Sequence, residues 1–112
     1  MRNKLNEFKK VITIMEKLDN SYKSKDGIEF LNNILFFFKK DLDLILEILG
    51  RYIVDESIIN KVGFNNRYNY LLKIKNDCHK MQNSDFCFTI MNFHYNNDIY
   101  HVIDILKNEL KK

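Results

Sequence analysis

Residues 26–50 read DGIEFLNNILFFFKKDLDLILEILG, and this stretch decides the fold. Asp26 can cap the start of a helix, Glu29 completes a capping box, and Gly50 supplies a C-terminal stop. The pattern predicts a helix about 34 Å long at 1.5 Å per residue, unless Lys39 to Asp41 breaks it. Its apolar residues recur at steps of three and four, the spacing that lines one helix face: Ile28, Leu31, Leu35, Phe38, Leu42, Ile45 and Leu49.

The rest of the chain shows the same helical spacing on both sides of this stretch. We call such a line of apolar residues along one helix face a seam. Further seams predict helices over about 3–19, 55–62, 65–81 and 96–110. Residues 86–95 fit a helix or a strand, because this run is rich in aromatic residues, and a helix is favoured because no obvious second strand exists. We therefore expect an all-α fold, a compact bundle of five or six helices that forms a single domain.

The composition is typical of one globular domain covering residues 1–112. The chain is 46% hydrophobic and 29% charged with a formal net charge of +3, so it can bury a core and lacks the signature of disorder. Its nine phenylalanines and its lack of proline and alanine are typical of an AT-rich genome. Residues 1–18 lack the apolar run of a signal peptide, and the apolar-rich run 30–38 is too short to span a bilayer. A cytoplasmic location is expected, with Cys78 and Cys87 as reduced thiols.

Few residues show a spacing that catalysis or metal binding requires. The two cysteines and three histidines lack the usual paired-ligand spacing, so no metal site is expected. The nearest candidate nucleophile and base in the sequence are Cys87 and His94, and the three isolated glycines form no phosphate-binding loop. We expect neither enzymatic activity nor a cofactor.

Phe36 is the most unusual residue of the long predicted helix. At 100° per residue it projects from a face that is otherwise polar and acidic. A large apolar side chain with a charged rim is typical of a binding hot spot, although another helix covering Phe36, or a scattered exposed residue, would also explain it. The predicted partner-binding residues are Phe36, Asn32, Asn33, Asp43, Glu47, Asp55 and Glu56.

Charge is unevenly distributed along the chain. Residues 1–25 hold seven basic and three acidic residues, residues 26–60 three and seven, residues 61–82 five and one, and residues 83–112 three and four. An acidic helical stretch between basic segments, in so small a chain, favours a protein that binds a charged protein partner. The leading hypothesis is an immunity- or antitoxin-type inhibitor of a toxin enzyme, such as a nuclease with a basic active site.

Two other functions fit the same features. A viral or phage helical protein that sequesters a host defence or signalling protein would share the size and composition. The basic segments would suit a nucleic-acid-binding regulator, in which case binding weakens steeply with salt. Steps of three and four also occur in coiled coils, so a homodimer through residues 28–49 is open. No membrane partner is expected.

Overall fold

The computed structural model describes residues 4–23, 27–53, 63–78 and 80–111, with the backbone alone for Phe36 and Phe37. These residues form six α-helices and one π-helical turn and contain no strand, so the predicted all-α bundle is confirmed. The elements are α1 (Lys4–Lys23), α2 (Gly27–Asn32), the π-helical turn η1 (Asn33–Phe38), α3 (Lys39–Tyr52), α5 (Phe64–Asp77), α6 (Asn83–Tyr95) and α7 (Asp98–Leu110).

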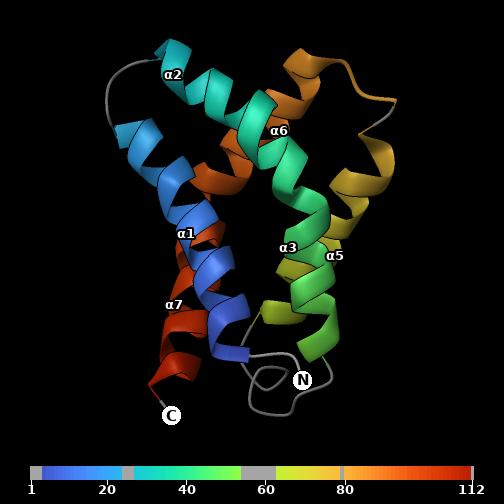
Figure 1. Cartoon of the computed structure of the whole chain (residues 1–112). Helices are drawn as coiled ribbons and strands as arrows, with labels where there is room; N and C mark the ends of the chain where they lie inside the picture. The colour runs from blue at the N-terminus through green and yellow to red at the C-terminus, as the bar shows by residue number, and fades with distance from the viewer. Residues whose placement is uncertain (1–3, 24–26, 54–62, 79, 112) are drawn as a thin grey trace.

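The helices pack around one apolar core. Helix α1 lies beside α7, and α3 lies beside α5, while α2, η1 and α3 follow one another as a single long segment across the molecule (Figure 1). Helix α6 packs against η1 and α7. Because the chain lacks alanine, the helices meet through bulky side chains, the largest of which are Phe8, Phe38, Phe64, Phe86 and Phe93.

The π-helical turn changes the phase of the long segment. The backbone N–H of Lys39 donates to the carbonyl of Ile34, five residues earlier. One extra residue in this turn offsets the helical phase by about 100°. The first half of the predicted seam is therefore wrong, since Ile28 is 75% exposed and Leu31 is 42% exposed while Ile34 is buried. The second half of the seam is confirmed by the burial of Phe38, Leu42, Ile45 and Leu49.

Gly50 lies inside α3, which continues to Tyr52, so the predicted stop at Gly50 is wrong. A Cβ atom on Gly50 would lie 2.8 Å from the hydroxyl oxygen of Tyr68 on α5. The missing side chain therefore allows Tyr68 to approach the backbone of α3. Glycine here serves close helix packing instead of helix termination.

Other boundaries agree with or extend the predictions. The ambiguous run 86–95 is helical in α6, as favoured, and α1 extends past residue 19 to Lys23. The short helix predicted over 55–62 lies outside the described residues. Cys78 and Cys87 are free cysteines. Within the described ranges, no helix combines the length and apolar character needed to cross a membrane.

Candidate functional site

The predicted partner-binding face is only partly formed. Asn32, Asp43 and Glu47 are exposed. The Asp43 carboxylate lies 3.2 Å from Lys75 Nζ, and the Glu47 carboxylate lies 3.0 Å from Arg51 Nη1. Each exposed acidic group of α3 therefore has a basic neighbour, which reduces the net charge of this face.

Asn33 is not on an exposed face, so the prediction for this residue is wrong. It is 7% exposed, and its Nδ2 group donates a hydrogen bond to Ser21 Oγ. Ser21 in turn donates to the carbonyl of Lys17 at 2.9 Å. The phase change in η1 turns Asn33 toward α1. The side chain of Phe36, and the residues Asp55 and Glu56, lie outside what the structure describes.

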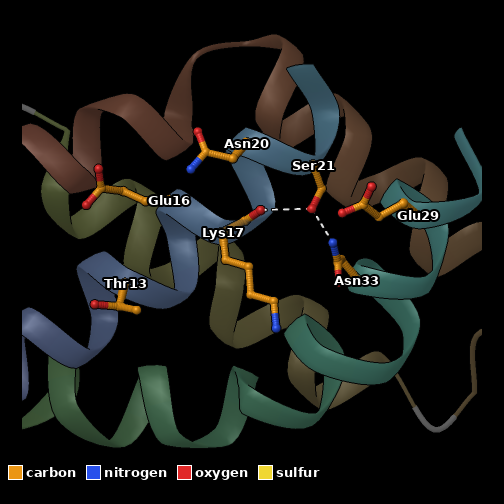
Figure 2. Close-up of a pocket in the computed structure, with 7 residues that line it drawn as sticks. All are labelled: Thr13, Glu16, Lys17, Asn20, Ser21, Glu29 and Asn33. Carbon is orange, nitrogen blue, oxygen red and sulfur yellow. Dashed lines mark hydrogen bonds between the residues drawn. The ribbon is translucent and has the colours of Figure 1, made fainter. Parts of the chain in front are cut away.

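Asn33 lines a polar groove of about 590 Å³ between α1 and the α2–η1 segment (Figure 2). The Ser21–Asn33 pair lies on one side of this groove, and Glu16 at the other end is 3.4 Å from Lys107. Its lining holds two glutamates and one lysine, and Glu16 has Lys107 as a basic neighbour, so the groove has no strong charge of either sign. Its complete lining is Thr13, Glu16, Lys17, Asn20, Ser21, Glu29 and Asn33.

A buried polar cluster, absent from the predictions, joins α1 to α6 and α7. His94 Nε2 lies 2.8 Å from Asp19 Oδ1, although the two residues are only 4% and 6% exposed. Lys23 Nζ lies 3.0 Å from the other carboxylate oxygen, and Tyr100 forms a hydrogen bond with the same carboxylate. The Asp19 side chain thus receives partners from three helices.

Aromatic rings surround His94. The centroid of its imidazole lies 4.2 Å from that of Tyr22, 5.8 Å from that of Tyr100 and 6.4 Å from that of Phe30. Its Nδ1 atom is buried and has no hydrogen-bond partner in the part of the chain that the structure describes. The rings and the Asp19 contact fix the orientation of the imidazole and attach α6 to the end of α1.

The charge of the cluster follows from its hydrogen bonds. Burial acts to raise the pKa of Asp19, but hydrogen bonds from Tyr100, His94 and Lys23 outweigh burial and bring the pKa below its ordinary value of 3.8. The same contacts with Asp19 raise the pKa of Tyr100 and of Lys23. At neutral pH the cluster therefore contains a carboxylate, an ammonium group and an un-ionised phenol.

The candidate nucleophile and base do not meet. Cys87 and His94 both lie on α6, separated by about 10 Å along the helix axis at 1.5 Å per residue. Burial raises the pKa of the Cys87 thiol, which favours the neutral form over the nucleophilic thiolate. Among the described residues, no group of three or more His, Cys, Asp or Glu side chains is placed to hold a metal ion.

The outer face of α6, defined by Phe88, Met91 and Tyr95, is largely apolar, with the exposed Asn92 among them. These residues are 66%, 39% and 77% exposed, and their spacing of three and four places them along one line of the helix. The inner face of the same helix is also apolar, with Phe86, Cys87, Ile90 and Phe93 buried. Helix α6 therefore differs from an ordinary surface helix, which presents charged residues to water.

The fold and these surfaces define a small all-α protein with an apolar outer face on α6 and a polar groove beside α1. No protein-family model, curated protein or solved structure matches the chain.

Proposed function

We propose that the protein binds a cognate protein and neutralises or inhibits it, with the outer face of α6 as the central contact. The exposure of Phe88, Met91 and Tyr95 along one line is the observation that supports this proposal most directly. Aromatic and methionine side chains are enriched at interface cores, and their removal from water is favourable. Asp85 is the single carboxylate among the 13 residues of α6, which contain no lysine or arginine, so docking desolvates few charges.

The acidic residues of α3 have a separate role in this proposal. The side chains of Asp43 and Glu47 remain 73% and 63% exposed despite their contacts with Lys75 and Arg51. Exposed charges of this kind affect the rate and orientation of encounter more than the final affinity. We assign them to the initial attraction of a partner and assign the affinity to α6.

The partner that fits an acidic stretch is basic. Residues 26–60 hold seven acidic and three basic residues. A toxin enzyme that acts on nucleic acid has a basic active site, so the narrower proposal is an immunity- or antitoxin-type inhibitor of such an enzyme. A host defence or signalling protein bound by a viral or phage protein is the alternative partner.

The experiment is capture followed by an activity assay. The tagged full-length chain is used to capture its partner, and the activity of that partner is measured as purified chain is added. The proposal predicts that activity falls and reaches a plateau at a fixed ratio of the two proteins. Unchanged partner activity throughout the titration would contradict neutralisation. Recovery of nucleic acid alone, released along a linear log–log salt dependence, would favour the nucleic-acid regulator.

A further inference from the structure

Three lysines from two helices line a pocket of about 430 Å³ at the junction of α3 and α5. Lys39 and Lys40 begin α3, directly after η1, and Lys75 lies in the last turn of α5. Asp43 is the one carboxylate among the described lining residues, so three lysines and one aspartate bring the formal charge of the lining to +2. The volume lies within the usual range of small-molecule sites.

Two of these three ammonium groups have defined contacts with neighbouring side chains. Lys39 Nζ lies 3.3 Å from Asn83 Oδ1 and 5.2 Å from the centroid of the Phe86 ring. Lys75 Nζ lies 3.2 Å from Asp43 Oδ1. Asp43 offsets one of the three positive charges, and the remaining like charges of the lining repel each other. An anion that enters the pocket lowers this repulsion.

The same pocket also has apolar lining residues. Leu42 is buried, and Met81, from the turn after α5, is half-buried. A site lined by both ammonium groups and aliphatic side chains suits an anion attached to an organic group. An inorganic anion would contact the ammonium groups but would leave the aliphatic side chains without a partner.

We propose that this pocket binds a phosphate monoester, whose phosphate contacts Lys39, Lys40 and Lys75 and whose organic part contacts Leu42 and Met81. A phosphate monoester has a charge of about −1.5 to −2 at neutral pH, which matches the charge of the lining, and lysine is a common phosphate ligand. An extended nucleic acid along α3 would instead meet the exposed carboxylate of Glu47. This inference does not depend on the proposed function: the affinity proposed above comes from α6, which contributes no residue to this lining, and Asp43 is the residue common to both proposals.

The test is an NMR titration of the ¹⁵N-labelled full-length chain with AMP as the probe. Adenosine, which lacks the phosphate, and a single-stranded RNA oligonucleotide are the comparison ligands at the same ionic strength. The proposal predicts saturable shifts of backbone amides confined to 39–43 and 75–81 with AMP, and much smaller shifts with adenosine. Equal shifts with adenosine, shifts spread over the whole chain, or tighter binding of the RNA at the same amides would overturn it.

Three double variants complete the test, and the two glutamine variants remove the same amount of charge. Lys40→Gln with Lys75→Gln should weaken AMP binding about tenfold or more, whereas Lys40→Arg with Lys75→Arg should retain it. The control is Lys9→Gln with Lys10→Gln, which removes two exposed lysines from α1, outside this pocket, and should change affinity by less than about twofold. Dispersed amide spectra show that each variant is folded. Equal weakening by both pairs of glutamine variants would show a general charge effect and overturn the proposed site.

Discussion

His94 Nε2 lies 2.8 Å from Asp19 Oδ1, and this contact joins residues 75 positions apart in the chain. Lys23 and Tyr100 bind the same carboxylate, so one buried side chain connects α1, α6 and α7. Because both partners are buried, removal of one leaves the other without its hydrogen bond in a medium of low dielectric constant. We therefore expect this cluster to affect stability more than any surface ion pair of α3.

Replacing Asp19 by asparagine keeps the size of the side chain but removes its charge. Asp19→Asn should lower the free energy of unfolding by about 1–3 kcal/mol, because three charge-assisted hydrogen bonds are weakened. Urea denaturation measures this loss. The control is Asp43→Asn, whose carboxylate is exposed beside Lys75 and should cost about 0.5 kcal/mol or less. Equal losses in the two variants would show that the buried cluster has no special role.

The contribution of Asp19 should depend on pH in a defined direction. Its pKa in the folded chain lies below the ordinary value of 3.8, so its stabilising effect is fully present well above that value. The effect is lost as the pH falls toward the lower folded pKa. The stability difference between the wild type and Asp19→Asn should therefore shrink as the pH falls below about pH 4. Urea midpoints over a pH series measure it, and a difference that grows on acidification would contradict the account.

Gly63 should be intolerant of a side chain. Its φ is +80°, and a Cβ atom would overlap Arg67 Nη1. Gly63→Ala should cost about 1–3 kcal/mol, both from the left-handed backbone and from displacement of Arg67, whose Nε lies 2.9 Å from Asp98. Thermal unfolding should show a lower Tm. Gly27→Ala is the control, because nothing lies within 4 Å of the added Cβ in that helix, and it should be neutral or stabilising by up to about 1 kcal/mol.

Arg51 contacts two carboxylates of unequal burial, which allows an internal comparison. Its Nη2 lies 2.7 Å from Glu7, whose side chain is 13% exposed, and its Nη1 lies 3.0 Å from Glu47, whose side chain is 63% exposed. Double-mutant cycles should give a coupling of about 1 kcal/mol for Arg51–Glu7 and below about 0.5 kcal/mol for Arg51–Glu47. The reverse order would mean that burial does not strengthen the contact between α1 and α3.

Helical spacing alone predicts most of the fold, because the core-facing residues of α3, such as Leu42 and Ile45, follow a period of 3.6. The assumption of an unbroken 3.6-residue period fails at Ile28 and Leu31, which are exposed. A π-helical turn adds one residue to a turn, is rare, and has no residue type that marks it in the sequence. The error at Asn33 has the same origin.

The surfaces were predictable only where they depend on local spacing. The exposure of Asp43 and Glu47 follows from the helical pattern of α3. The contact of Asp19 with His94 depends on how α1 packs against α6, which periodicity does not report. The sequence did contain a sign of the apolar face of α6. The run 86–95 has apolar residues pointing to several sides of the helix, and a helix at the surface of a small domain cannot bury all of these residues.

The central claim is that the outer face of α6 provides the affinity for a protein partner. The most direct measurement is a calorimetric titration with the partner that the wild-type chain captures, which compares the affinity of the wild type with that of the double variant Phe88→Ala with Tyr95→Ala. The control is Asn108→Ala, which changes an exposed residue near the end of α7. We predict a loss of about thirtyfold or more for the double variant and less than about twofold for the control. Unchanged affinity of a folded double variant would contradict the claim.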